Sequence, residues 1–192
     1  MNKTKNAIFE VAIKEFSMNG YNKTTMDSIA EKAGVAKGTL YYHFNSKEEI
    51  FNYIMEEGMS RLSYRVEEAV KGQKNFYSKF KILCKVQLMM VYENKEFFKV
   101  IMSQLWGQES RQLELRKALK DYFSQLEGYI KEAIAEKAIR GGNAALMAYS
   151  LFGTICAAAI YELINNSMEI DAVVDNLMDY ILKGVDCENV YS

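Results

Sequence analysis

The chain has 192 residues, of which 49% are hydrophobic and 26% are charged. These proportions are ordinary for a globular protein, so they exclude a disordered chain and a fibrous repeat. The sequence contains no proline. Because proline breaks helix interiors but is common in turns and edge strands, its absence favours a structure that is nearly all helix.

The net charge of −1 conceals a polarised distribution along the chain. Residues 1–47 contain seven lysines and four acidic residues, a balance of +3, so the remaining residues carry −4. A cationic segment attracts a polyanion, whereas an acidic segment repels one. The charges therefore predict that nucleic acid binds through the N-terminal part only.

Cysteine usage and the N-terminus indicate the compartment. The three cysteines, at positions 84, 156 and 187, are odd in number and far apart, without the paired spacing of zinc, redox or disulfide motifs. Charged residues at positions 10, 14 and 15 interrupt the apolar stretch that a signal peptide needs. We expect a cytoplasmic protein with no cofactor and no metal site.

The first 44 residues predict three successive helices. Apolar residues at three- and four-residue steps predict the first helix over about residues 3–18, ended by Asn19-Gly20. Either Thr24 or Thr25 can cap a short second helix, with Asp27 completing a capping-box-like arrangement. Gly34 permits the left-handed backbone of a sharp turn before a third helix over about residues 37–44.

A capping box, Ser46-Lys47-Glu48-Glu49, opens a long helix of about 25 residues that ends near Gly72. Residues that favour turns divide the rest of the chain into five more helices. These predicted helices cover about residues 76–93, 95–107, 110–139, 143–166 and 170–184. The whole pattern predicts an all-α fold of about nine helices.

Residues 141–161 carry no charge, and a run of this length has to be considered as a membrane span. Ser150, Gly153 and Thr154 dilute the run, Glu162 follows it directly, and the other helices are amphipathic. We therefore favour a buried helix over a membrane span. The small residues Gly153 and Ala157 permit close helix approach in either case.

The residues from Thr24 to Glu49 read TTMDSIAEKAGVAKGTLYYHFNSKEE, a helix, a tight turn and a second short helix. A helix that enters a major groove needs a thin, donor-rich leading end, which Lys37-Gly38-Thr39 supplies. Tyr41, Tyr42 and His43 follow with groups that can donate to phosphates. The alternative is that Tyr41 and Tyr42 serve only in packing.

This segment resembles the signature T-T-x-x-x-I-A-x-x-A-G-V-x-K-G-T-L-Y-Y-x-F-x-S-K-E-E of the TetR family of transcriptional regulators over 26 residues without a gap. The resemblance implies DNA contacts by Thr25, Lys37, Gly38, Thr39, Tyr41, Tyr42, His43 and Lys47. Base reading would rest chiefly on Lys37, Thr39 and Tyr41. The chain departs from the family at Ala36, where a serine or threonine often caps the helix, and at Asp27, where many relatives carry a basic contact residue.

The resemblance also implies a helix-turn-helix domain over residues 1–47 and a helical ligand-binding and dimerisation domain over residues 48–192. Aromatic and methionine residues in the second domain could line an apolar pocket, with ordinary core as the alternative for most of them. The pocket candidates are Met89, Phe98, Met102, Trp106, Tyr122, Phe123, Tyr149 and Phe152. Trp106, the only tryptophan, is the first choice.

The last two helices carry the candidate dimer interface, namely Gly153, Ala157, Ile160, Tyr161, Ile164, Val174, Leu177, Met178 and Ile181. The resemblance thus implies a repressor that binds palindromic operator DNA as a homodimer and is released by a small, largely apolar effector, without a membrane. Alternatives are an activator, a regulator without a small-molecule effector, a helical enzyme or a membrane-associated protein. A single histidine, His43, and the lack of a nucleophile motif weigh against catalysis.

Overall fold

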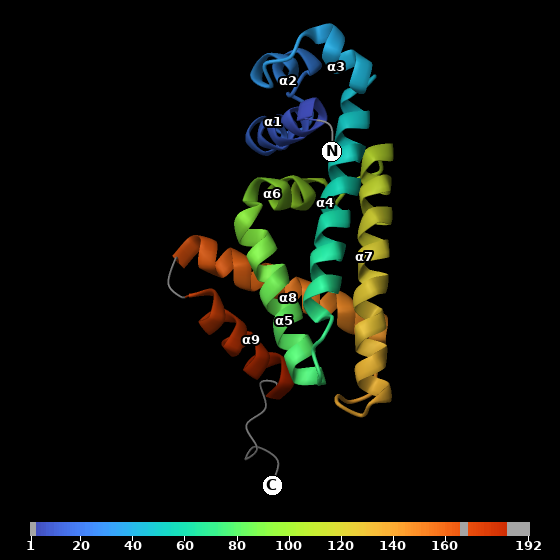
Figure 1. Cartoon of the computed structure of the whole chain (residues 1–192), viewed down its shortest axis with the longest axis vertical. Helices are drawn as coiled ribbons and strands as arrows, with labels where there is room; N and C mark the ends of the chain where they lie inside the picture. The colour runs from blue at the N-terminus through green and yellow to red at the C-terminus, as the bar shows by residue number, and fades with distance from the viewer. Residues whose placement is uncertain (1–2, 166–168, 184–192) are drawn as a thin grey trace. The chain divides into compact units, whose positions relative to one another are not determined.

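The computed structural model describes residues 3–165 and 169–183 (Figure 1). Within these ranges the chain forms nine α-helices and no strand, which confirms the predicted all-α fold. The helices are α1 (Lys3–Asn19), α2 (Met26–Lys32), α3 (Lys37–His43), α4 (Lys47–Val70), α5 (Phe76–Glu93), α6 (Lys95–Gln104), α7 (Ser110–Ala135), α8 (Ala144–Asn165) and α9 (Ile170–Lys183).

Two predicted helices are shorter in the structure than in the sequence analysis. Helix α6 ends at Gln104, three residues before the predicted end, and α7 ends at Ala135, four residues early. Lys137 has a φ of 57°, a left-handed conformation that a helix cannot continue through. The predicted final residues of the last two helices, 166 and 184, lie outside the described residues.

The described residues cluster into two compact units, each of which draws on two stretches of the chain. Unit 1 contains residues 3–61 together with Asn94–Tyr122, and unit 2 contains the described residues of 62–93 and of 123–183. Helices α4 and α7 each contribute one part to each unit. The predicted domain boundary at residues 47 and 48 follows the DNA-binding motif, and it remains a prediction.

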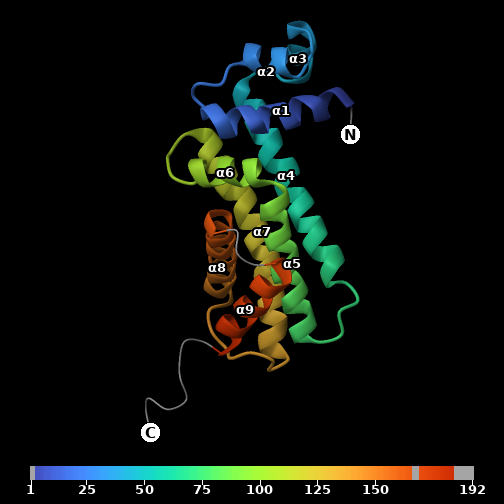
Figure 2. The same ribbon diagram turned by 90° about the vertical axis from the view of Figure 1, so that its left-hand side faces the viewer.

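In unit 1, α1 packs against α6 and α2, and α2 packs against α3 (Figure 2). Phe16 of α1 and Phe51 of α4 are buried, with their ring centroids 6.0 Å apart, and Tyr21 packs against both rings. The buried carboxylate of Glu15 accepts from the ammonium of Lys32 at 2.6 Å. Apolar packing thus holds α1 on α4, and one part-buried ion pair joins α1 to α2.

Both ends of helix α2 are capped by residues that lie close to it in the sequence. The Thr25 hydroxyl accepts from the Ser28 backbone N–H at 3.1 Å, and the Ser28 hydroxyl oxygen accepts from the Thr25 N–H at 3.2 Å. The prediction that Asp27 completes this capping box is wrong, because Ser28 lies three residues after the true cap, Thr25. At the other end, Gly34 has a φ of 65°, and the N–H groups of Gly34 and Val35 close a Schellman motif.

Gly58 lets α4 and α6 approach closely within unit 1. A Cβ atom built on Gly58 would lie 2.2 Å from the Phe97 ring, which is closer than real Cβ atoms come to a neighbour. Glycine in a helix interior costs roughly 0.5–1 kcal/mol relative to alanine. The close packing of Phe97, which is 5% exposed, explains why the helix carries glycine here.

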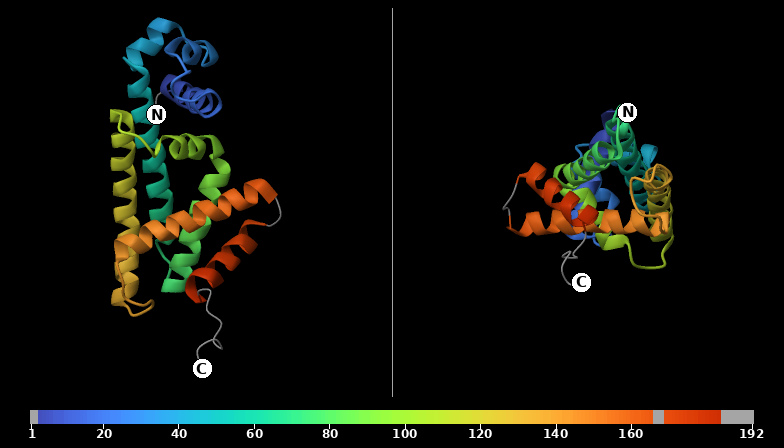
Figure 3. Two further views of the ribbon diagram at one scale, coloured as in Figure 1. Left: turned by 180° about the vertical axis from the view of Figure 1, so that it is seen from behind. Right: turned by 90° about the horizontal axis from the view of Figure 1, so that it is seen from below.

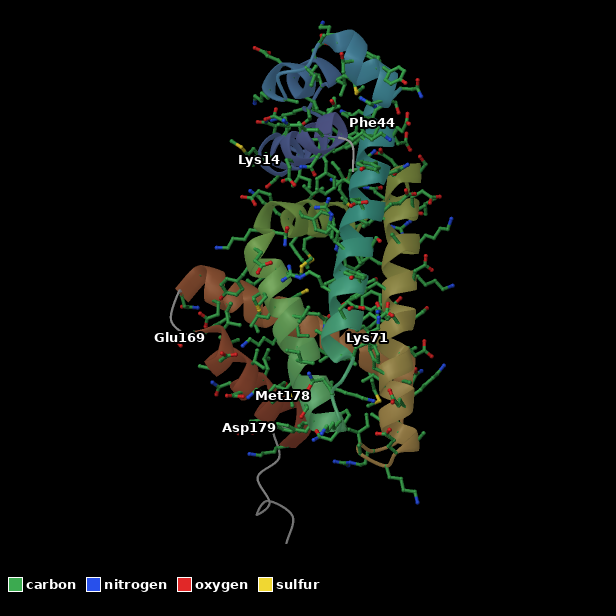
Figure 4. All side chains as sticks on the ribbon, viewed as in Figure 1. Lys14, Phe44, Lys71, Glu169, Met178 and Asp179 are labelled. Atoms are coloured by element: carbon green, nitrogen blue, oxygen red, sulfur yellow. The ribbon has the colours of Figure 1, made fainter. Side chains whose placement is uncertain are left out.

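In unit 2, helices α8 and α9 pack against α5 and against each other (Figure 3). On α9, Met178 is buried beside α5, whereas the next residue, Asp179, is exposed (Figure 4). The segment Ala144–Glu162 of α8 is the one described helix segment that is long and apolar enough to cross a membrane, and a third of it is buried. The helix predicted to be buried is therefore buried on one side only.

Candidate DNA-binding surface and effector cleft

Helix α3 has one buried face and one exposed face. Leu40 is fully buried and Phe44, the residue that ends the helix, is 2% exposed. In contrast, Tyr42 is 85% exposed and Tyr41 is 48% exposed, so neither tyrosine is a core residue of the chain. The outward face of α3, which the sequence analysis assigned to DNA, is thus open to solvent.

The remaining α3 candidates share this exposure. Lys37, Gly38 and Thr39 are exposed, and His43 is half-buried with its ring 5.1 Å from that of Tyr42. A Cβ atom added to Gly38 would meet no atom within 4 Å. Nothing in the described part of the chain therefore requires glycine at this position. Ala36 provides no side-chain hydrogen bond to the start of α3, as the sequence predicts.

An ion pair joins the first turns of α2 and α3. The Lys37 Nζ donates to Asp27 Oδ2 at 2.6 Å, and both side chains are more than half exposed. The hydrogen bond and the negative charge of Asp27 raise the pKa of Lys37 above its ordinary value. Sequence reasoning placed Asp27 in the capping box and noted it as a departure from the family, but it did not predict the ion pair with Lys37, because residues ten apart share no local spacing rule.

Lys47, a predicted phosphate contact, is bonded to the segment between α1 and α2. Its Nζ donates to the carbonyl oxygens of Tyr21 at 2.6 Å, Thr24 at 2.8 Å and Asn22 at 3.3 Å. These bonds match the three donors of an ammonium group. Burial lowers the pKa of Lys47, and the positive charge of Arg111 adds to the effect.

Tyr21 and Arg111 complete this cluster, and sequence reasoning missed both. The Arg111 guanidinium lies 4.0 Å from the Tyr21 ring centroid, and Lys47 Nζ lies 4.4 Å from the same centroid. Burial raises the pKa of Tyr21, partly offset by Arg111. The cluster connects the start of α7 with the helix-turn-helix inside unit 1. The residues lie too far apart in sequence for any local signal to reveal them.

Unit 2 contains an open cleft with a volume of about 880 Å³. It is mainly apolar, and its lining includes Phe76, Phe80, Ile130, Leu151 and Ile181. The first four of these residues also line a small, partly open cavity of about 20 Å³, so the cleft and the cavity adjoin. The volume of the cleft falls within the 300–1,000 Å³ typical of sites for small ligands.

Polar groups are few in this cleft. Tyr77, Ser150 and Thr154 supply hydroxyl groups, and Arg140 supplies a cation at an exposed position. Among the described residues, Arg140 forms no ion pair with a carboxylate. The cleft can therefore hold an apolar group and present one cation and several hydroxyl groups to a polar end.

The eight predicted pocket residues divide between the two units. Phe123, Tyr149 and Phe152 form an aromatic cluster in unit 2, with the Phe123 and Tyr149 rings stacked at 3.8 Å. Trp106 is 86% exposed and Met102 44% exposed, both in unit 1. Phe98 and Tyr122 are buried in unit 1, and Met89 is half-buried in unit 2. The cleft and the cavity are lined by other residues, and the pocket assignment remains a prediction.

The predicted dimer residues fall into an exposed group and a buried group. Five on α8 are exposed, namely Gly153, Ala157, Ile160, Tyr161 and Ile164. They continue the exposed apolar positions Leu146 and Tyr149 along one face at three- and four-residue steps. On α9, Val174, Leu177 and Met178 are buried within unit 2, and Ile181 is half-buried in the cleft wall.

The comparisons with known proteins agree with this architecture. Residues 8–54 match the tetR family of bacterial regulatory proteins. The solved structure of a candidate fatty acid metabolism regulator from Clostridium perfringens is 43% identical, with a TM-score of 0.89 over 95% of this chain and 100% of that chain. The chain belongs to the TetR family. It is a DNA-binding transcriptional regulator of the helix-turn-helix type.

Two further matches, one to a sequence and one to a solved structure, come from Bacillus subtilis. The fatty acid metabolism regulator protein of strain 168 is 27% identical over 184 residues, which cover 93% of each chain. The solved structure of FadR in complex with stearoyl-CoA is 24% identical, has a TM-score of 0.82, and matches 94% of this chain and 99% of that chain. The likeness to this structure concerns the fold.

Proposed function

We propose that the chain represses transcription as a homodimer on palindromic operator DNA and that a fatty acyl-CoA releases it. The observation that carries the effector assignment is the mainly apolar cleft with Arg140 at an exposed position. An acyl chain would fill the apolar part, and Arg140 would meet the phosphates of the coenzyme. The relatives named for fatty acid metabolism, and the FadR complex with stearoyl-CoA, support this chemistry.

For the DNA contacts we propose the outward face of α3, with Lys37, Thr39 and Tyr41 reading base edges. Thr25, Tyr42, His43 and Lys47 would contact phosphates, and Gly38 would let the backbone approach the duplex. Exposure of this face supports the proposal, as does the open space around Gly38. Lys47 would have to exchange a carbonyl partner for a phosphate oxygen.

For the dimer we propose that the exposed stripe of α8 packs against a second copy. Ile164 is 76% exposed and Ile160 49% exposed, and a Cβ atom on Gly153 would meet nothing within 4 Å. A long apolar face that contains the small residues Gly153 and Ala157 suits close packing of two helices. Two-fold symmetry is common in oligomers of identical chains. A two-fold dimer would offer two recognition helices to the two halves of a palindrome.

The effector is tested with duplex DNA from upstream of the gene and a panel of stearoyl-CoA, stearic acid and free CoA. We expect stearoyl-CoA to release the DNA and free CoA to have no effect. Ala138→Trp, which adds an indole group to the lining of the cleft, should retain DNA binding and lose release, whereas Ala135→Trp on the exposed end of α7 should behave as wild type. If stearoyl-CoA still releases the Ala138→Trp protein normally, the cleft assignment is wrong.

The dimer is tested by analytical ultracentrifugation at micromolar concentration. Ile160→Glu should yield monomers with unchanged helix content, because a charge cannot be buried unpaired between two copies. Leu113→Glu is the matched control, since Leu113 of α7 is also 49% exposed and lies outside the stripe. A dimeric Ile160→Glu protein, or a wild-type monomer that binds a palindrome tightly, would contradict the proposed interface.

A further inference from the structure

The ion pair between Asp27 and Lys37 has no evident role in the stability of the fold. Its partners are 59% and 67% exposed, and ion pairs in such positions contribute little to stability. Asp27 is also not needed as a helix cap, because Thr25 and Ser28 form the capping box of α2. An acidic side chain on a surface that meets phosphates weakens DNA binding in general. Its place in the first turn of α2 suits the helix dipole, but this small effect at an exposed position does not explain the pairing with Lys37.

The geometry of the pair resembles that of a G·C base-pair edge. In the major groove, guanine presents the acceptors O6 and N7, and cytosine presents the donor N4. Guanine O6 and cytosine N4 are hydrogen-bonded to each other, so they lie about 2.9 Å apart. Lys37 Nζ and Asp27 Oδ2 are separated by 2.6 Å, with the donor and the acceptor in the complementary order.

We propose that Asp27 and Lys37 read one G·C base pair in each half of the operator as a single unit. Lys37 donates to guanine O6 and N7, and Asp27 accepts from cytosine N4. Asp27 thereby determines sequence specificity, in addition to orienting Lys37. The proposal rests on the proposed docking of α3 in the major groove, and Gly38 beside the pair leaves room for that approach.

Other base pairs fit the two side chains less well. A reversed C·G pair would set the cytosine donor against the ammonium and the guanine acceptor against the carboxylate. A T·A pair presents the same neighbouring acceptor and donor, thymine O4 and adenine N6, but the thymine methyl group takes the place of the second acceptor, guanine N7. An A·T pair offers Asp27 the adenine N6 donor but gives Lys37 one acceptor, N7, instead of two adjacent acceptors. The carboxylate also repels the phosphates of duplexes that do not present the G·C pair. The ion pair between Asp27 and Lys37 therefore favours binding to the specific site and disfavours binding to unrelated DNA.

The test starts with selection of a binding site from a pool of random duplexes by the wild-type protein. Each base pair of the selected site is then replaced in turn, and dissociation constants are measured. We expect a G·C pair in each half-site whose replacement weakens wild-type binding roughly tenfold or more. For Asp27→Asn, replacement of that pair should cost less than about threefold, while binding to unrelated duplexes becomes tighter.

Further variants separate the effect of the ion pair between Asp27 and Lys37 from the effect of charge alone. Asp121→Asn removes the same charge from an exposed position of α7 and should change neither base preference nor non-specific binding. Lys37→Met should lose the same base preference, and the double variant should show little additional loss, since residues that act as a unit are not additive.

Two results would overturn the reading of this base pair while leaving the proposed function intact. One is an Asp27→Asn protein whose binding to every duplex weakens by the same factor. The other is an Asp27→Asn protein whose base preference is the same as that of the wild type at every position of the site. Failure of the wild-type protein to select any duplex would overturn the proposed function and this inference with it.

Discussion

The proposed DNA-binding surface and the proposed effector cleft are assembled in different ways. All proposed DNA contacts come from one continuous segment between Thr25 and Lys47. The cleft instead combines α5, α7, the segment between α7 and α8, α8 and α9, between residues 76 and 182. In the first region, local capping and turn rules position the helices, and within the described residues only Lys37 and Lys47 of these contacts are held by partners ten or more residues away. In the second, the site exists only once distant helices have packed, so shape and volume matter more than any single residue.

The largest expected effect separates the two faces of the recognition helix. Leu40→Ala should lower the free energy of unfolding by about 2–5 kcal/mol, because it leaves a cavity at a fully buried position. Tyr42→Ala, at a position that is 85% exposed, should leave stability within roughly 0.5 kcal/mol and weaken operator binding. Urea unfolding and DNA titration of both proteins measure this contrast. Equal losses of stability would contradict the assignment of the faces.

Two glycines sharpen the comparison between packing and binding. Gly58→Val should destabilise unit 1 by about 1–3 kcal/mol, because the added atoms collide with the Phe97 ring. Gly38→Ala should leave stability unchanged or raise it slightly, since helix propensity improves and space is available. The same Gly38→Ala protein should bind operator DNA more weakly. Normal operator affinity would show that close backbone approach at Gly38 is not needed.

Lys47 tests whether one residue serves both the fold and the DNA. Lys47→Met should cost roughly 1–2 kcal/mol of stability, because three carbonyl oxygens lose a charged donor. If Lys47 also contacts a phosphate, the slope of log affinity against log salt should fall by about one unit. A loss of stability with an unchanged salt slope would remove Lys47 from the DNA contacts.

The smallest effect concerns the thiols of unit 2. Burial raises the pKa of Cys84 to about 12 and that of Cys156 to about 11. At pH 8 both are almost entirely protonated, so a disulfide reagent should react at least about a hundredfold more slowly than with a free cysteine of pKa about 8.5. Each unit of pH increase should raise the rate about tenfold below these pKa values. Cys187→Ser allows the two thiols to be followed alone, and rapid reaction of the folded protein would contradict their burial.

Sequence reasoning recovered the elements that local rules govern. The Gly34 turn, the buried Leu40 and the weak cap at Ala36 all follow from spacing within a few residues, and each is present in the structure. The role predicted for Asp27 was wrong. Because Thr24 and Thr25 could each cap the helix, the sequence did not determine which residue completes the capping box. The true cap is Thr25, and Ser28 is its partner in the capping box. Asp27 instead forms an ion pair with Lys37.

The cleft could not be predicted, because its residues have no common spacing. Phe80 and Ile130 look like any core residue in the sequence, and Trp106, chosen for its rarity, is exposed on the segment between α6 and α7. The apolar composition of the last two helices led us to predict a dimer surface on both α8 and α9. The predicted α8 residues are exposed, whereas most of the predicted α9 residues are buried within the same chain. A periodic pattern shows that a helix has an apolar face without showing which neighbour covers it.

The coupling between effector and DNA is measured most directly by titrating fluorescent operator duplex with protein, with and without saturating stearoyl-CoA. We predict that stearoyl-CoA raises the operator dissociation constant by about 5- to 150-fold and that operator DNA weakens stearoyl-CoA binding by the same factor. Free CoA should change neither value. Operator affinity that stays constant while stearoyl-CoA is bound would contradict release by an acyl-CoA effector.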